Sequence, residues 1–327
     1  MQFHLNFQPK GTQNQITHQD EILFMGSCFS EHIASRMSEL KFHVNTNPFG
    51  IVFNPKSMLL NLNRMLYKDY FTVNDVFEKD RIWYSFDAHS SLYASSQFEL
   101  LKRLNDLIDQ WHEKIQVSSF LMLTFGSAYA YYHKQQQKVV ANCHKLPQII
   151  FDKNLLNYYE IVSEFQLFID ELKRLNPKLK IVFTVSPVKH LRDGVIENNL
   201  SKAILIQSVH QLVQQNERCL YFPAYELVAD DLRDYRFYEA DMAHPNLQAI
   251  NYVWSKFSEV YFNEITQQMN TKLSQIHQAY LHRIMNQSSE NAMKFKESFY
   301  QKCVSLKEEF PFLNLEEELT YFQTRTN

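Results

Sequence analysis

Apolar residues along the chain alternate between short runs and helical spacing. The run ILFM ends at Gly26. Apolar positions then recur at spacings of four, four and three residues, at Phe29, Ile33, Met37 and Leu40. A short apolar run followed by one apolar helical face predicts a strand, a tight turn and an amphipathic helix.

The same alternation continues along the chain. Apolar runs predict strands at 119–125, 180–186 and 218–222. Helical spacing predicts helices at 98–115, 161–175, 200–215 and 246–265. Asn54 followed by Pro55 predicts a further helix start, with Asn as the N-cap and Pro in the first helical position. Strands separated by helices of this length predict a three-layer α/β fold, in which helices cover both faces of a parallel sheet.

Two stretches depart from the alternation. Residues 68–96 carry mixed aromatic residues without a clean period, and we expect irregular structure there. From 266 onward the chain is rich in Gln, Asn, Lys and Glu at helical spacing and shows no strand signal. We therefore expect two parts, an α/β domain over 1–265 and a helical C-terminal extension over 266–327.

Glycine is scarce enough to be informative. The chain has 5 Gly in 327 residues, where average usage of roughly 7% would give about 23. Gly26, Gly50 and Gly126 fall at or near predicted strand ends or the loops beside them. In an open parallel sheet ligands bind at the carboxyl ends of the strands, so these glycines indicate where the site lies.

Charge and composition exclude several classes of protein. A formal net charge of −3 argues against a nucleic-acid partner. No apolar run approaches the ~18 residues that span a bilayer, and the first 25 residues lack a signal-peptide pattern. The four cysteines are spread through the chain, which argues against a disulfide framework. We expect a cytoplasmic protein without a membrane span.

A candidate nucleophile follows Gly26. Ser27 and Cys28 stand at the predicted strand-to-helix turn, where helix N–H groups and the positive dipole end favour an anion. A thiol in that first turn is expected to have a lowered pKa. The alternative is structural: Ser27 caps the helix and Cys28 is a small core residue.

A candidate base lies near the end of the α/β part. Asp241 and His244 stand three residues apart just before a predicted helix. At that spacing a carboxylate can hydrogen-bond one imidazole nitrogen while the other faces a substrate. Taken alone, an exposed turn also explains such a pair.

Two further stretches carry polar chemistry. Cys143 and His144 suggest a zinc site with Cys28 and His244, but adjacent residues on a strand point in different directions. We expect no metal and no cofactor, and His144 is then a second polar group of the pocket. The stretch SPVKHLRDG supplies Lys, His and Arg side chains, either for an anionic substrate group or as solvated loop charges.

Seven stretches in order resemble one family. They are GSCFS, NPFGIVFNP, LTFGSAYAYY, VANCHK, VSPVKHLRDG, YFPAYELVADDLRDYRFY and DMAHP. Together they resemble the GSCFA-domain family over about 21–245, with continuation at HRIMNQSSENAMKF. That family is similar to the SGNH, or GDSL-type, hydrolases, which are mostly esterases, lipases and acetyl-ester hydrolases acting without a metal. The resemblance implies a doubly wound, flavodoxin-like parallel sheet.

The resemblance also implies roles for the two candidate motifs. The Gly-Asp-Ser block of the SGNH enzymes, laid on Gly26-Ser27-Cys28, places the nucleophile at Cys28. Ser27 is a rival, because a shift of one residue in the turn would present its hydroxyl instead. The final Asp-x-x-His block falls on Asp241 and His244.

The blocks that stabilise the oxyanion match less completely. The second-block glycine, a backbone donor, falls on Gly50, and the third-block glycine falls on Gly126. The asparagine position of that third block falls on Ala128, which is a departure from the pattern. We expect Asn142 to supply the missing amide.

These roles imply acyl transfer at an ester or thioester. The expected activity is that of an SGNH-like hydrolase or acyltransferase, and the expected substrate is a small molecule or a glycan- or lipid-linked acyl group. The alternative is a catalytically inactive ligand-binding or scaffold protein with the same fold.

Overall fold

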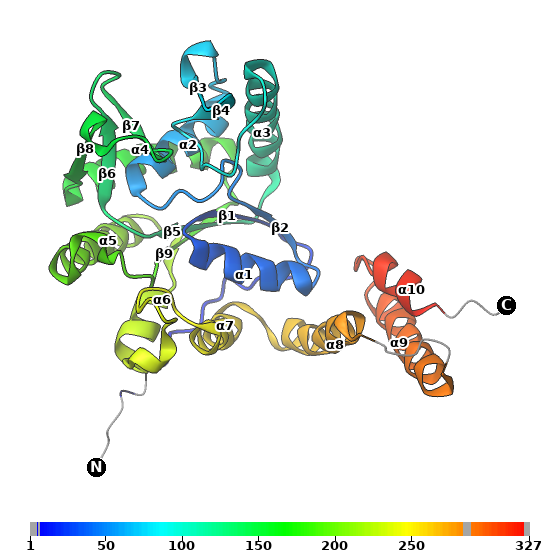
Figure 1. Cartoon of the computed structure of the whole chain (residues 1–327). Helices are drawn as coiled ribbons and strands as arrows, with labels where there is room; N and C mark the ends of the chain where they lie inside the picture. Colours follow the sequence, from blue (N-terminus) through cyan, green and yellow to red (C-terminus); the bar gives the residue numbers. More distant parts are fainter. Residues whose placement is uncertain (1–4, 6, 284–288, 324–327) are drawn as a thin grey trace. The chain divides into compact units, whose positions relative to one another are not determined.

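A five-stranded sheet forms the core of the α/β part of the chain. The computed structural model describes residues 5, 7–283 and 289–323. The strands of the sheet are β1 (Glu21–Gly26), β2 (His43–Thr46), β5 (Phe120–Phe125), β9 (Lys180–Val185) and β10 (Cys219–Tyr221). They lie in the order β10-β9-β5-β1-β2 (Figure 1), and the β10/β9, β9/β5 and β5/β1 pairs are parallel. Counted along the chain this is the 2-1-3-4-5 order of flavodoxin-like folds, so the predicted fold class is confirmed.

The two faces of the sheet are covered by different helices. Leu23 and Met25 of β1 belong to a core built with four helices on one face. These are α2 (Pro55–Tyr67), α3 (Gln97–Val117), α4 (Tyr158–Leu175) and α5 (Val195–Gln215). Phe24 points to the other face and packs with Phe29 of α1 (Cys28–Glu39) and Phe257 of α7 (Leu247–Tyr261). Alternate strand residues therefore enter two cores, which gives the three layers seen in Figure 1.

Helix boundaries follow the predicted signals with two exceptions. The Asn54 side chain accepts a 2.9 Å hydrogen bond from the Ser57 N–H, and Pro55 opens α2 as predicted. Helix α5 begins at Val195, earlier than the predicted residue 200. The apolar side chains of its first turn face solvent and do not continue the buried face of the helix, so the apolar spacing did not indicate this turn. Helix α7 ends at Tyr261, before the predicted 265.

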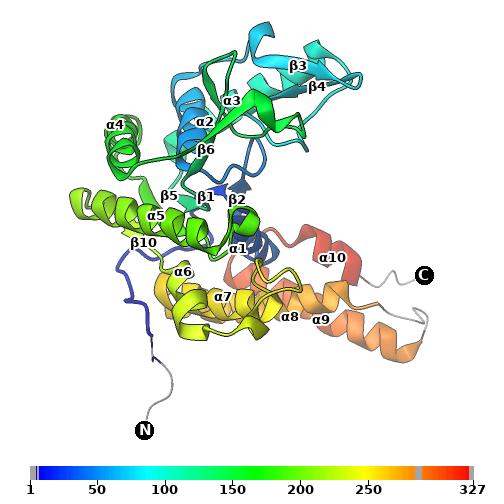
Figure 2. The ribbon, with the colours of Figure 1, turned by 60° about the vertical axis from the view of Figure 1, so that its left-hand side comes forward.

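Small antiparallel sheets are added on one side of the main sheet. Strands β3 (Val76–Lys79) and β4 (Ile82–Ser85) form a hairpin after a short 3-10 turn, so the expected irregular structure over 68–96 is wrong. Its turn residues Asp80 and Arg81 take positive φ without any glycine, which removed the usual turn signal. A second sheet contains β7 (Lys138–Val140), β6 (Tyr129–His133) and β8 (Phe151–Leu155), with β6 in the centre. Figure 2 shows β3, β4 and β6 on the side of the main sheet that holds α2 and α3.

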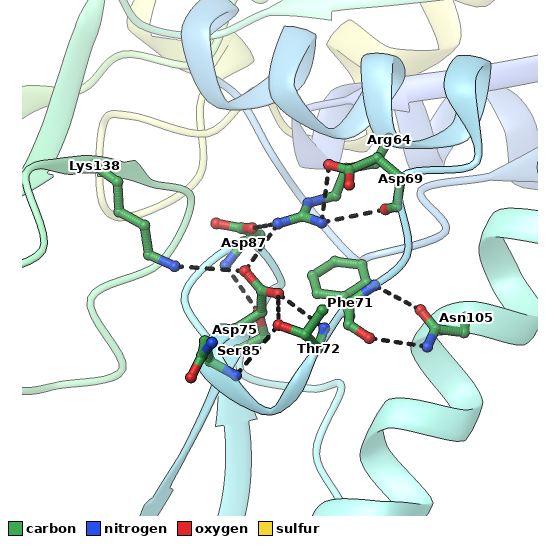
Figure 3. Close-up of polar contacts among 10 residues, drawn as sticks. Arg64, Asp69, Phe71, Thr72, Asp75, Ser85, Asp87, Asn105 and Lys138 are labelled. Atoms are coloured by element: carbon green, nitrogen blue, oxygen red, sulfur yellow. Dashed lines mark hydrogen bonds and ion pairs between the residues drawn. The ribbon is translucent and has the colours of Figure 1, made fainter.

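A buried ion-pair cluster joins this hairpin to α2 (Figure 3). Arg64 contacts carboxylate oxygens of Asp87 at 3.0 Å, Asp75 at 3.1 Å and Asp69 at 3.3 Å. Lys138 of β7 lies 3.8 Å from Asp75. Burial raises the pKa of Asp87 although the Arg64 charge acts in the opposite direction. The cluster fixes α2, the segment before β3 and the end of β4 to one another.

The chain divides into two compact units. The first contains Met1–Lys10, Glu21–Ala34 and Val44–Phe257; the second contains Gly11–Asp20, Ser35–His43 and Ser258–Asn327. The second unit includes α8 (Glu264–Leu281), α9 (Glu290–Glu309) and α10 (Glu316–Phe322). Within it, Ile16 donates its N–H to the Tyr261 carbonyl at 2.7 Å, and Lys41 pairs with the buried Glu318 at 2.6 Å.

The sequence-based division at residue 265 stays a prediction. Part of the tail stretch HRIMNQSSENAMKF, residues 284–288, lies outside the described residues. Among the helices that the structure describes, none is long and apolar enough to cross a bilayer.

Candidate active site

The first candidate motif forms a tight turn at the carboxyl end of β1. Gly26 has φ +148°, and a side chain there would clash with the Thr124 backbone of the neighbouring strand. Ser27 is 3% exposed, and its hydroxyl donates to the Ser186 hydroxyl at 3.1 Å. Cys28 is half-buried and is the first residue of α1. The turn therefore directs Ser27 toward the end of β9 and leaves Cys28 the more accessible of the two.

The Cys28 thiol does not have the lowered pKa expected at a helix N-terminus. Burial and the nearby Glu31 carboxylate raise the pKa of Cys28, and backbone N–H groups and the Lys202 charge only partly oppose this. The helix dipole favours the thiolate, but the acidic residue in the first turn of α1 opposes that effect. At neutral pH a general base is therefore needed to form the thiolate.

Asp241 and His244 form a preorganised pair. His244 Nδ1 lies 2.6 Å from Asp241 Oδ2. The other carboxylate oxygen accepts the N–H groups of Ala243 at 2.9 Å and His244 at 3.0 Å. These backbone hydrogen bonds are the main cause that lowers the pKa of Asp241 to about 2, so its carboxylate is ionised at neutral pH. Nδ1 is thus fixed as the donor to Asp241, and no described residue hydrogen-bonds to His244 Nε2.

Both motifs contact the segment that follows β9. Ser186 bonds to Ser27, as described above. Three residues later the Lys189 N–H donates to the Ala243 carbonyl at 3.0 Å, beside His244. Since β1 and β9 run parallel in one sheet, the nucleophile turn and the Asp–His loop lie at the same carboxyl edge. Within the described residues Cys28 and His244 do not hydrogen-bond directly.

Gly50 and Gly126 pack closely against neighbours at this edge. Gly50 has φ +76°, lies against His89, and donates its N–H to the Asn47 carbonyl at 2.8 Å. Gly126 donates its N–H to the Phe53 carbonyl at 2.7 Å. A donor role for the Gly50 N–H therefore requires that the turn hydrogen bond be shared or broken.

Asn142 and His144 lie in a loop after β7, not on a strand as expected. The Asn142 side-chain oxygen accepts the His144 N–H at 2.7 Å. His144 is buried beside the rings of Phe77 and Tyr84, and its Nε2 lies 2.7 Å from the Ser85 carbonyl. Burial lowers the pKa of His144 to about 4, so this ring is neutral at pH 7.

The residues of the alternative zinc site, Cys28, Cys143, His144 and His244, do not assemble into a metal site. Burial raises the pKa of Cys143 to about 11, which disfavours the thiolate that a metal needs. Among the residues that the structure describes, no three His, Cys, Asp or Glu side chains are placed to hold one ion.

A cavity of about 830 Å³ extends from Ser127, the residue after Gly126, to the Asn142 loop. Cys28, Asp241 and His244 are not among its lining residues. Ser127, His190, Asn142 and His144 line it, with aromatic walls from Phe53, Tyr129, Tyr131 and Phe151. Four cationic side chains border it, Lys145, Lys153, Lys189 and Arg192, against one carboxylate, Asp193. Lys153 pairs with Asp193, which leaves an excess of positive charge on the lining.

The family can be assigned directly. The model described as "GSCFA family" matches residues 21–257, and the model described as "GSCFA domain protein, C-terminal domain" matches 273–327. The chain belongs to the GSCFA family. No curated protein matches this GSCFA chain.

Two solved structures are distantly similar to the GSCFA chain. One is a carbohydrate esterase of family 3 from Talaromyces cellulolyticus, at 7% identity and TM-score 0.36, with 77% of this chain and 99% of that chain covered. The other is an acetyl xylan esterase from the rumen bacterium Butyrivibrio proteoclasticus, at 9% identity and TM-score 0.37, with 80% and 66% covered.

One buried cation at this site was not predicted from the sequence of the GSCFA chain. Lys202 of α5 is fully buried, and its Nζ donates to the carbonyls of Gly126 at 2.6 Å and Ser186 at 2.7 Å. Burial lowers the pKa of Lys202 to about 7. A signal was present, because Lys202 precedes Leu205, Val209 and Leu212 at spacings of three, four and three on the apolar face of α5.

Proposed function

We propose that this GSCFA protein catalyses acyl transfer through Cys28, as an ester or thioester hydrolase or an acyltransferase. The observation that carries the proposal is the Asp241–His244 pair. Its free Nε2 lies at the sheet edge where Cys28 opens α1. A thiol whose pKa is raised needs a general base, and the imidazole that Asp241 orients at the same sheet edge is suited to that role.

The reaction proceeds in two steps. His244 Nε2 takes the Cys28 proton, and the sulfur attacks the acyl carbonyl, whose π electrons move to oxygen. The tetrahedral intermediate collapses to a thioester, and the leaving group departs with the proton held by His244. Water or another hydroxyl or amine acceptor then attacks the thioester and restores the thiol.

The oxyanion of this reaction needs donors. The Cys28 N–H at the start of α1 is one. Gly50 is a proposed contributor at the position that the family resemblance indicates, and Asn142 is a proposed substitute for the amide that the resemblance places at Ala128. Gly126 is proposed to let the substrate approach the edge closely. Loss of one such donor typically raises the barrier by about 2.7–4 kcal/mol.

The cavity supports a substrate with anionic character. Its lining carries more cations than carboxylates, and its aromatic walls suit a ring or an acyl chain. A small molecule or a glycan- or lipid-linked acyl group that bears a negative charge fits this lining. A thioester intermediate can pass its acyl group to such an acceptor as well as to water.

A binding or scaffold role is the second candidate. It is favoured by Ala128, a buried methyl group where the family resemblance implies an amide donor. A protein without that donor can retain the cavity and bind a ligand without turning it over.

Steady-state hydrolysis of activated acetyl, butyryl and succinyl esters tests the proposal. We expect alcohol release by the wild type, release by Ser27→Ala, and none above background by Cys28→Ala, with Cys303→Ala, a cysteine outside the cavity, as the thiol control. A succinyl ester, which carries a carboxylate, should be preferred over butyryl. No release by the wild type from any of these donors would favour the binding role, and loss only in Ser27→Ala would make that hydroxyl the nucleophile.

A further inference from the structure

His190 has a buried ring nitrogen without a partner. It follows β9 at the carboxyl edge, and its backbone N–H is held by the Asn198 side chain at 2.9 Å. Within the described residues no group hydrogen-bonds to its buried Nε2. An unpaired buried polar atom carries a desolvation cost, so a retained one calls for an explanation.

The surroundings of this nitrogen place it at the cavity, beside the carboxyl end of β5. The His190 ring packs on Phe53 with centroids 5.0 Å apart, and Nε2 lies 3.1 Å from where a Cβ on Gly126 would stand. His190 also lines the cavity. Only glycine at position 126 leaves this nitrogen open to a ligand atom that approaches the end of β5.

His190 shares electrostatic neighbours with the proposed catalytic residues. Lys202 acts on both Cys28 and His190, and His244 acts on His190. Burial first, and then the charge of Lys202, lower the pKa of His190 to about 4. The ring is therefore neutral at pH 7. A neutral imidazole with so low a pKa is a poor base, but it still has one N–H to donate.

We propose that His190 Nε2–H donates a hydrogen bond to the oxyanion formed when Cys28 attacks the acyl carbonyl. No atom passes to or from His190: the carbonyl π electrons move to oxygen as the sulfur–carbon bond forms, and the hydrogen bond stabilises the resulting charge. The inference rests on the proposed function and assigns His190 as a further catalytic residue. A neutral, positioned imidazole suits this role because it needs no reorganisation as the charge develops.

Two reactions of the same sulfur test the assignment. Acylation by an activated acetyl ester forms an oxyanion, whereas alkylation by iodoacetamide displaces iodide without one. Both rates are measured on the Cys28 peptide by mass spectrometry. We expect His190→Ala to slow acylation by about 10²–10³-fold and to leave alkylation unchanged.

Further variants separate this role from folding and from base catalysis. His190→Leu keeps an apolar side chain against Phe53 and should match His190→Ala, so the test survives if the Ala variant does not fold. His190→Gln retains an N–H donor and should recover part of the acylation rate. His244→Ala should slow both reactions, and His43→Ala, an exposed histidine, should slow neither.

Each contrary result has a distinct meaning. If the wild type is acylated, and both His190→Ala and His190→Leu are acylated at the wild-type rate, the assignment to His190 is overturned while the proposed function stands. Equal slowing of acylation and alkylation would also overturn it, since His190 would then act on the thiol. Absence of acylation in the wild type would reject the proposed function, and the oxyanion role with it.

Discussion

The buried side chain of Lys202 donates a 2.6 Å hydrogen bond to the carbonyl oxygen of Gly126. It also donates to the Ser186 carbonyl, and so joins the carboxyl ends of β5 and β9 beneath the candidate site. We expect Lys202→Met, which keeps the length but not the donors, to lower the free energy of unfolding by about 1–3 kcal/mol. Urea denaturation measures this, and an unchanged midpoint would show that the two hydrogen bonds add nothing.

Lys202 also predicts a pH dependence of stability. Burial lowers its pKa to about 7 in the folded state, against about 10.4 for an unfolded lysine. Between these values the unfolded chain binds more protons, so this group makes the free energy of unfolding rise with pH. The rise from pH 7 to pH 9 should be larger in the wild type than in Lys202→Met. Equal slopes in urea denaturation would contradict the shift.

The thiol of Cys28 should lose its proton at a higher pH than an ordinary cysteine thiol. Burial and Glu31 raise its pKa, so its iodoacetamide alkylation rate should still be climbing above about pH 8.5, the ordinary thiol value. Glu31→Gln removes one of the two causes and should move the midpoint down. The rate is read on the Cys28 peptide, because Cys143 is also half-buried. A midpoint below pH 7 would instead indicate a preformed thiolate–imidazolium pair.

Removal of the Asp241 charge should disable His244 as a base. Asp241→Asn loses the acceptor for Nδ1–H, and we expect acylation of Cys28 to slow by about 10²–10⁴-fold. Because the pKa of Asp241 is about 2, the wild-type rate should show no inflection from this group above pH 4. Asp234→Asn, an exposed carboxylate paired with Arg236, is the matched control. Equal rates for the two variants would remove Asp241 from the mechanism.

The Arg64 cluster should behave as a buried ion pair (Figure 3). Arg64→Met leaves the buried Asp87 charge unpaired, and we expect a loss of about 3–5 kcal/mol in the free energy of unfolding. Arg64→Met combined with Asp87→Leu should lose less than the sum of the single variants. Lys102→Met, in an exposed pair with Asp106, should cost about 0.5 kcal/mol or less. Strict additivity would show that Arg64 and Asp87 are not coupled.

Most of the main sheet could be predicted because β1, β5 and β9 are buried on both faces. Strand β2, which reads HVNT and is exposed or half-buried, was not predicted. Runs such as FLMLTF are apolar except for the buried Thr124, and the helices between them carry clear apolar faces. The antiparallel strands were missed for the opposite reason. Strand β8 reads FDKNL with alternating exposure, and the β3–β4 turn uses Asp80 and Arg81 in place of glycine. Short, half-exposed strands carry little periodic signal.

In the candidate site, too, some residues could be predicted from the sequence and others could not. Asp241 and His244 are close in sequence, so their pairing follows from local spacing alone. His190 and Lys202 gain their environments from residues far along the chain, Gly126 and Cys28. The association of residues 11–20 and 35–43 with the C-terminal helices is equally non-local. No local pattern encodes contacts of this kind.

The most direct test of the account is the mass of the Cys28 peptide after brief exposure to an activated acetyl ester at pH 7.5. We predict an acetyl thioester on that peptide, labile to hydroxylamine, formed by the wild type and much more slowly by His244→Ala. An acetyl group that stays on the Ser27 hydroxyl in Cys28→Ala, or equal labelling of Cys28 in wild type and His244→Ala, would contradict the account.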